Sequence, residues 1–159
     1  MTCSHQEREL LPFYWLIGEG LADLVMTAHI HHRGWDEKFP ATLSPRVLGE
    51  MLRRKTGYQG VVISDDLLMG GIGKQFSLEE ACVLAVQAGA DILLASNNGP
   101  EGDDPHLFER VFEGLVKAVE QGRISRERID ISHSRLVALG QKLVGRNPLP
   151  GPSRATKRG

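Results

Sequence analysis

The sequence predicts an α/β fold in which helices cover a parallel sheet. Three short apolar segments, at 24–26, 61–63 and 91–96, have the composition of strands, and each leads into polar residues or a turn. Helical segments separate them, which is typical of βαβ units. Because right-handed crossovers bring the carboxyl ends of parallel strands to one edge, residues 27–32, 64–69 and 96–98 are expected to meet there.

The amino-terminal third predicts a helix, a strand and a long loop. Residues 10–17 have apolar side chains crowded at helical spacing, and Pro12 suits the first turn, where its missing N–H costs nothing. Glycines end this helix, and a strand is expected within 21–30. Residues 31–42 carry glycine, proline and mixed charge, so they predict a loop that leaves the carboxyl end of that strand.

The motif GYQGVVISDDLLMGG at 57–71 is the most informative stretch. Its apolar residues 61–63 suit a strand buried on both faces, and this strand is expected to stop at Ser64, directly before Asp65 and Asp66. The helix that leads into it starts at Ser44, an N-cap residue followed by proline. Carboxylates at the carboxyl end of such a strand lie where parallel sheets place their chemistry.

The carboxyl-terminal half continues the alternation. Ser77 and Glu80 form a capping box that introduces a helix ending at Gly89, and 91–96 is the third strand, followed by a turn at Asn97 and Asn98. Further amphipathic helices are expected at 105–120 and from 125 to about 144. We divide the chain into one folded unit, 1–146, and a proline- and glycine-rich tail, 147–159, expected to be disordered.

Charge and cysteine content exclude several classes of function. The 159 residues include 19 basic and 20 acidic side chains, so no overall field attracts nucleic acid or an anionic membrane. Cys3 and Cys82 are far apart, which argues against a zinc site or a disulfide framework and favours a reducing compartment. No segment approaches the ~18 consecutive apolar residues of a membrane span, and no signal core begins the chain. We expect a cytoplasmic protein.

The chemical role of the two aspartates stays open at this level. A strand-end carboxylate serves as nucleophile, general acid or base, or metal ligand, or it caps the following turn. Alternation along a strand points Asp65 and Asp66 in opposite directions, so we expect at most one of them to face the centre of a site.

Histidine and tryptophan side chains follow the first strand. A metal site at His29, His31 and His32 is disfavoured, because catalytic zinc wants three protein ligands on rigid elements and two of these lie in a loop. A hydrogen bond from His29 to a polar substrate is favoured instead. Trp35 is either a platform for a sugar or a hydrophobic clamp on the loop, and the clamp is favoured.

With these residues in place, the chain resembles the carboxyl-terminal part of a glycoside hydrolase family 3 catalytic barrel, in the β-N-acetylhexosaminidase branch. The resemblance runs from about residue 9 to residue 140, and its specific block is the motif at 57–71. The other motifs that carry it are ELLPF at 9–13, DLVMTAHI at 23–30, PATLSP at 40–45 and AGADILLASNN at 88–98.

The resemblance implies a fold, a reaction and site residues. The fold is a partial (β/α)8 barrel, its last three strands and their helices, because a whole barrel takes ~250 residues. The reaction is hydrolysis of terminal non-reducing N-acetylglucosamine by a retaining mechanism, with Asp65 as nucleophile. Asp66, Met69 and His29 are expected around the sugar. Neither a metal nor another cofactor is implied, and the expected partner is a saccharide of the muropeptide type.

The resemblance also implies what this chain lacks. The family's Lys-His sugar-binding motif and its His-Asp acid/base pair precede residue 9 in the family pattern, and the flanks of His5 do not match that pattern. The chain is therefore expected to be a fragment, or a half-barrel that pairs with a chain carrying the first strands. A non-catalytic remnant is the alternative. A β-glucosidase or a phosphorolytic enzyme is the sister possibility within the family, although Ala28-His29 and Asp66 favour the hexosaminidase branch.

Overall fold

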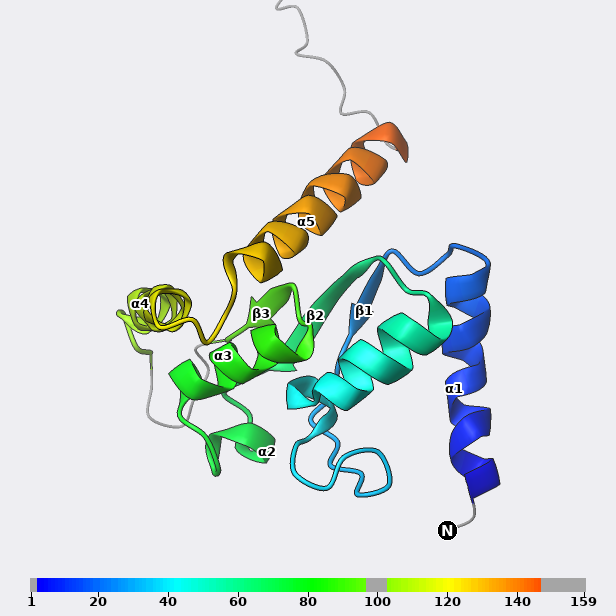
Figure 1. Cartoon of the computed structure of the whole chain (residues 1–159), viewed down its shortest axis with the longest axis horizontal. Helices are drawn as coiled ribbons and strands as arrows, with labels where there is room; N and C mark the ends of the chain where they lie inside the picture. The colour runs from blue at the N-terminus through cyan, green and yellow to red at the C-terminus, as the bar shows by residue number, and fades with distance from the viewer. Residues whose placement is uncertain (1–2, 97–102, 147–159) are drawn as a thin grey trace, which may run out of the picture.

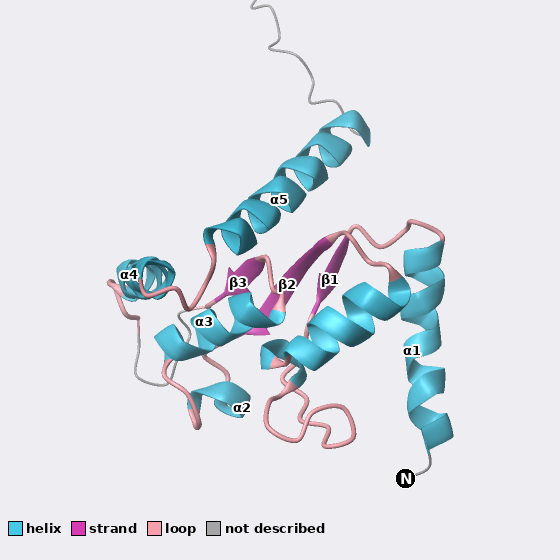
Figure 2. Cartoon of the chain, viewed as in Figure 1, coloured by secondary structure: helices cyan, strands magenta, loops and turns pink. Residues whose placement is uncertain are grey.

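The computed structural model describes residues 3–96 and 103–146 and contains a three-stranded parallel sheet flanked by helices (Figures 1 and 2). The strands lie in chain order, with β2 in the centre, paired in parallel with β1 and β3. The elements are α1 (Cys3–Gly18), β1 (Leu24–Met26), the 3-10 turn η1 (Ala41–Leu43), the π-helix η2 (Arg46–Arg54), β2 (Val61–Asp66), α2 (Gly70–Gly73), α3 (Leu78–Ala88), β3 (Ile92–Leu94), α4 (Leu107–Glu120) and α5 (Arg126–Arg146).

The predicted alternation of strands and helices is confirmed, and so are both predicted N-caps. The Ser44 hydroxyl accepts a hydrogen bond from the Val47 N–H at 3.0 Å, and the Ser77 hydroxyl accepts one from the Glu80 N–H at 3.2 Å. The Glu80 carboxylate, which a capping box would direct back to the Ser77 N–H, pairs with Arg123 instead. These caps depend on residues three apart, which is why the sequence reveals them.

Two local predictions are wrong. The first helix begins at Cys3, so Pro12 lies inside it and not in its first turn. The residues before Pro12, SHQEREL, are mostly good helix formers and extend the helix past the position where proline removes one backbone donor. The strand predicted to stop at Ser64 runs on to Asp66.

The hydrophobic core lies between the sheet and the helices on one of its faces. Val62 at the centre of β2 is fully buried, and it belongs to a cluster with Leu48 of η2 and with Ala81 and Ala85 of α3. The opposite face is less covered, since Leu24 and Met26 of β1 are 41% and 54% exposed. Burial on both faces was predicted for residues 61–63 of β2, where Val61 and Val62 are buried and Ile63 is partly buried. The side chains of β1 are less covered because three strands do not close into a barrel with a filled interior.

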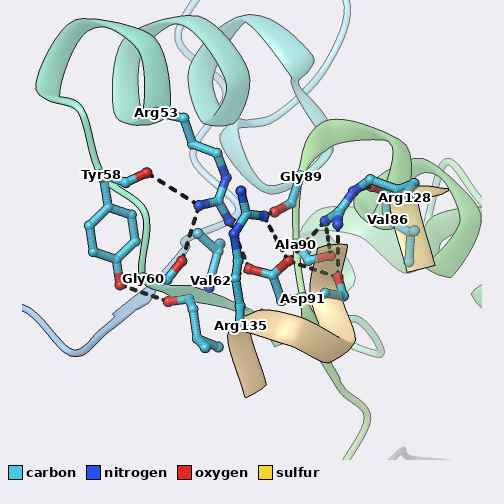
Figure 3. Close-up of polar contacts among 12 residues, drawn as sticks. Arg53, Tyr58, Gly60, Val62, Val86, Gly89, Ala90, Asp91, Arg128 and Arg135 are labelled. Atoms are coloured by element: carbon cyan, nitrogen blue, oxygen red, sulfur yellow. Dashed lines mark hydrogen bonds and ion pairs between the residues drawn. The ribbon is translucent and has the colours of Figure 1, made fainter. Parts of the chain in front are cut away.

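An ionic cluster fixes the amino-terminal end of β3 to two helices (Figure 3). The Asp91 side chain is fully buried and accepts from Arg53 of η2 at 2.7 Å and from Arg128 and Arg135 of α5 at 3.1 Å each. Burial raises the pKa of Asp91, but its hydrogen bonds and the arginine charges more than reverse this and hold the pKa below 3.8. The cluster anchors α5, which extends from this edge of the sheet (Figure 1).

Two predictions fall outside the described residues, namely the turn at Asn97 and Asn98 and the disordered tail at 147–159. No helix in the described part of the chain is long and apolar enough to cross a membrane.

Candidate active site

The expected meeting of the strand ends is confirmed by hydrogen bonds across the carboxyl edge of the sheet. Nε2 of His29, which follows β1, lies 2.8 Å from the carbonyl oxygen of Asp66 at the end of β2. The Ser96 N–H, which follows β3, donates to Oδ1 of Asp66 at 3.1 Å. Residues that follow β1 and β3 are thus brought to Asp66 at the end of β2.

A β-bulge shapes β2 at this edge. Ile63 pairs with Ile92 and Asp66 pairs with Leu94, so β2 has one residue more than β3 between the two pairs. The Ser64 hydroxyl accepts the Leu94 N–H at 2.9 Å, which satisfies this strand donor where the ladder is irregular. Because the bulge interrupts strict alternation, the opposite orientation of Asp65 and Asp66 no longer follows from their spacing alone. Their hydrogen bonds distinguish them instead.

Among the described residues, one carboxylate oxygen of Asp65 has no protein donor. Its backbone N–H donates to Oγ1 of Thr27 at 3.3 Å, and its Oδ1 accepts the Asp66 N–H at 2.9 Å. Within the described residues, no hydrogen bond or ion pair reaches Oδ2 of Asp65. One side of the carboxylate is therefore held while the other is available to a ligand.

The Asp66 carboxylate, in contrast, is fully engaged with its surroundings. Oδ1 accepts the N–H groups of Leu68 and Ser96, both at 3.1 Å, and Oδ2 accepts the Ser96 hydroxyl. Burial raises the pKa of Asp66, but these hydrogen bonds lower it below its ordinary value. Asp66 therefore joins the turn after β2 to the end of β3, while its predicted contact with substrate stays a prediction.

His29 is placed at the edge as predicted, but both of its ring nitrogens have protein partners. Nδ1 lies 2.8 Å from Oγ1 of Thr42, and Nε2 contacts the Asp66 carbonyl oxygen. The predicted hydrogen bond from His29 to substrate also stays a prediction. Thr42 was missed by the sequence analysis, although the motif PATLSP that contains it was recognised.

The remaining candidates lie around this edge. Met69 is 49% exposed and precedes α2, where its N–H donates to the Asp66 carbonyl oxygen at 3.0 Å. The Trp35 ring packs on His32 with centroids 4.8 Å apart, a contact that agrees with the clamp interpretation. Trp35 also lines an apolar cavity of about 280 Å³ between α1, β1 and η2, which Asp65 does not line. No three His, Cys, Asp or Glu side chains of the described residues are grouped so that they could hold a metal ion.

Parallel strands whose polar residues converge at the carboxyl edge are the arrangement found in α/β barrels. A comparison with protein families matches residues 4–139 to "Glycosyl hydrolase family 3 N terminal domain". This chain belongs to glycoside hydrolase family 3.

Relatives and solved structures agree with this assignment. The beta-hexosaminidase A of Pseudoalteromonas piscicida is 31% identical over 148 residues, which are 86% of this chain and 25% of the relative. A family 3 β-N-acetylglucosaminidase from Paenibacillus sp. str. FPU-7 superposes with a TM-score of 0.82 and 37% identity, over 98% of this chain and 29% of that one. The beta-glucoside phosphorylase BglX superposes with a TM-score of 0.71 and 26% identity, over 82% of this chain and 24% of that one.

These comparisons confirm the predicted family and the partial barrel. The chain spans about a quarter of the length of the relatives it matches. Several of these relatives carry the name beta-hexosaminidase, including two from Histophilus somni that are 41% identical over 90 residues.

Proposed function

We propose that this chain carries the nucleophile of a β-N-acetylhexosaminidase site that removes terminal non-reducing N-acetylglucosamine. Membership of family 3 and the names of the relatives support the substrate class. The observation that carries the choice of residue is the difference between the two aspartates. Asp65 has a carboxylate oxygen without a partner in the described structure, whereas both oxygens of Asp66 accept hydrogen bonds.

In the proposed reaction, a carboxylate oxygen of Asp65 attacks the anomeric carbon of the sugar. A bond forms between this oxygen and the carbon, the bond from the carbon to the aglycone oxygen breaks, and that oxygen takes a proton from a general acid. Water then attacks the same carbon, releases Asp65 as a carboxylate and gives the sugar with its original anomeric configuration.

The general acid is proposed to come from the strands that precede this segment in a full barrel, on a continuation of the chain or on a separate chain. The uncovered face of the sheet, with Leu24 and Met26 exposed, supports such a partner. General acid help is worth ~10²–10⁴ in rate, so without it this chain is expected to turn over only substrates with a good leaving group.

The proposed physiological substrate is a muropeptide-type saccharide met during peptidoglycan recycling in the cytoplasm. The β-N-acetylhexosaminidase branch that the motif at 57–71 resembles supports this substrate. Cys82 is a buried free thiol, which suits a reducing compartment.

A substrate that does not need the general acid tests Asp65 directly. The purified chain is incubated with 2,4-dinitrophenyl N-acetyl-β-glucosaminide, whose leaving group departs without a proton, and intact mass and peptide mapping follow the protein. We expect a covalent N-acetylhexosaminyl adduct on the peptide that contains Asp65, absent from Asp65→Ala and present in Asp130→Ala, whose side chain is exposed on α5.

The same mixture separates the alternatives. If added phosphate attacks the anomeric carbon of the covalent adduct, displaces the Asp65 carboxylate and gives a sugar 1-phosphate, the chain is a phosphorylase, as one solved relative is named. If no adduct forms even when the preceding strands of the barrel are co-expressed, the chain is a non-catalytic remnant. An adduct on Asp66 would refute the assignment of the nucleophile.

A further inference from the structure

Side chains outside β2 form a chain of hydrogen bonds that connects the backbone of Asp65 to the backbone of Asp66. Oγ1 of Thr27 lies 3.3 Å from the Asp65 nitrogen and 2.8 Å from Oγ1 of Thr42. Oγ1 of Thr42 lies 2.8 Å from Nδ1 of His29, whose Nε2 lies 2.8 Å from the Asp66 carbonyl oxygen. The contacts therefore run from the amide of Asp65 to the carbonyl of Asp66.

When the His29 ring is neutral, the chemistry of the two ends determines the direction of every hydrogen bond in this series. The Asp66 carbonyl oxygen only accepts, so Nε2 of His29 carries the proton, and in the neutral ring Nδ1 is then an acceptor. The Thr42 hydroxyl must donate to Nδ1, which leaves its oxygen to accept from the Thr27 hydroxyl. The Thr27 oxygen in turn accepts the Asp65 N–H.

We propose that Thr27, Thr42 and neutral His29 form a one-way hydrogen-bond chain that orients the Asp65 carboxylate, with His29 as a positioning residue. The chain fixes the N–H of Asp65 and the C=O of Asp66, while the N–H of Asp66 holds Oδ1 of Asp65. These contacts together fix the direction in which Oδ2 of Asp65 points. This inference rests on the proposed role of Asp65 as nucleophile.

Burial makes each link of the chain costly to remove. Thr42 is fully buried and Thr27 is 8% exposed, so water does not readily replace a lost partner. Gly71 packs closely against His29, because a Cβ on Gly71 would lie only 3.3 Å from the His29 Cβ. The last glycine of the motif at 57–71 thus lets the segment after β2 pack against His29.

Nuclear magnetic resonance of the full chain tests the proton arrangement without any need for activity. With ¹⁵N-labelled histidine at about pH 8, above the ordinary histidine pKa, the His29 signals are those that disappear in His29→Gln. We expect a protonated Nε2 and an unprotonated, hydrogen-bonded Nδ1. In Thr42→Val the Nδ1 resonance moves toward that of a free acceptor, and Thr42→Ser retains the hydroxyl and the original resonance. A proton on Nδ1, or an averaged mixture of tautomers, overturns the proposal.

Amide hydrogen exchange tests the other end of the chain. Removal of the Thr27 hydroxyl in Thr27→Val deprives the Asp65 N–H of its acceptor, and we expect its exchange to become at least about fivefold faster. Thr27→Ser is the matched control that keeps the acceptor. Unchanged exchange at Asp65 in Thr27→Val refutes this link.

The rate of adduct formation with the dinitrophenyl substrate tests positioning itself. We expect Thr42→Val to form the Asp65 adduct about tenfold more slowly at saturating substrate, with little change in the half-saturating concentration, and Thr42→Ser to recover most of the rate. An equal rate in Thr42→Val and wild type refutes the positioning role. If wild type forms no adduct, the proposed nucleophile fails, while the resonance and exchange results still decide whether the hydrogen-bond chain exists.

Discussion

Adjacent arginines in η2 allow a sharp test of the ionic cluster at Asp91. Arg53 is 14% exposed and bonds to Asp91, whereas Arg54 is 73% exposed and pairs with Glu50 one turn away. The substitutions Arg53→Ala and Arg54→Ala remove the same side chain from neighbouring positions of one helix. Any difference in stability between them therefore reports the surroundings of the guanidinium group.

The expected magnitude follows from the bonds that Arg53 makes. Its guanidinium donates to the carbonyl oxygens of Gly60 and Gly89 at 3.0 and 3.2 Å and to Asp91 at 2.7 Å (Figure 3). Loss of a buried charge-assisted bond costs about 1.5–3 kcal/mol and each neutral bond about 1 kcal/mol. Since Asp91 keeps its bonds to α5, we expect Arg53→Ala to lower the free energy of unfolding by about 3–4 kcal/mol. Arg54→Ala is expected to change it by less than about 0.5 kcal/mol.

Urea unfolding followed by far-ultraviolet circular dichroism measures both values on the same day and in the same buffer. The slope of the free energy against urea should match among the three proteins, which shows that the folded and unfolded states are comparable. A loss below about 1 kcal/mol in Arg53→Ala would refute the view that this cluster joins η2 to the sheet.

Three further outcomes follow from Asp91, Gly71 and Cys82. The pKa of Asp91 in the folded chain lies below its ordinary value, so its carboxylate stabilises the fold at higher pH and this contribution is lost as the pH falls through the lowered pKa. Asp91→Asn should therefore flatten the loss of stability on acidification, measured by urea unfolding between about pH 5 and 2. Gly71→Ala should shift the ring resonances of His29 and destabilise by about 1–3 kcal/mol, whereas Gly49→Ala, with open space around it, should not destabilise. Burial raises the pKa of Cys82 to about 12, so with the other cysteine replaced by serine, thiol reagents should label the chain only after unfolding, as mass spectrometry would show.

The secondary structure was predictable because its signals are local. Strand composition, helical spacing and the Ser44 and Ser77 caps all depend on residues a few positions apart. The bulge in β2 was not predictable, because it depends on the Leu94 N–H meeting the Ser64 hydroxyl, 30 residues away in sequence. The Arg53–Asp91 pair, 38 residues apart, was invisible for the same reason.

The sequence located the site but not its internal order. The motif at 57–71 placed two carboxylates at a strand end, and only the resemblance to family 3 chose Asp65. The structure adds a physical difference between the two, since Ser96 and Leu68 engage Asp66 and leave an oxygen of Asp65 free among the described residues. Thr42 had no signal of its own, because a threonine in a loop reveals nothing until the fold brings it to His29.

The two edges of the sheet are stabilised by opposite kinds of interaction, and this contrast fits a nucleophile at one of them. At the amino-terminal edge Asp91 is buried, accepts hydrogen bonds and is surrounded by three arginines. The hydrogen bonds and the arginine charges outweigh burial and lower the pKa of Asp91, which also weakens it as a base. At the carboxyl edge the described residues form no ion pair with Asp65, and neutral threonine and imidazole groups hold its backbone. An arginine paired with Asp65 would fix it equally well, but it would draw electron density from the oxygen that we propose attacks carbon. Neutral hydrogen bonds provide the orientation and leave that oxygen nucleophilic.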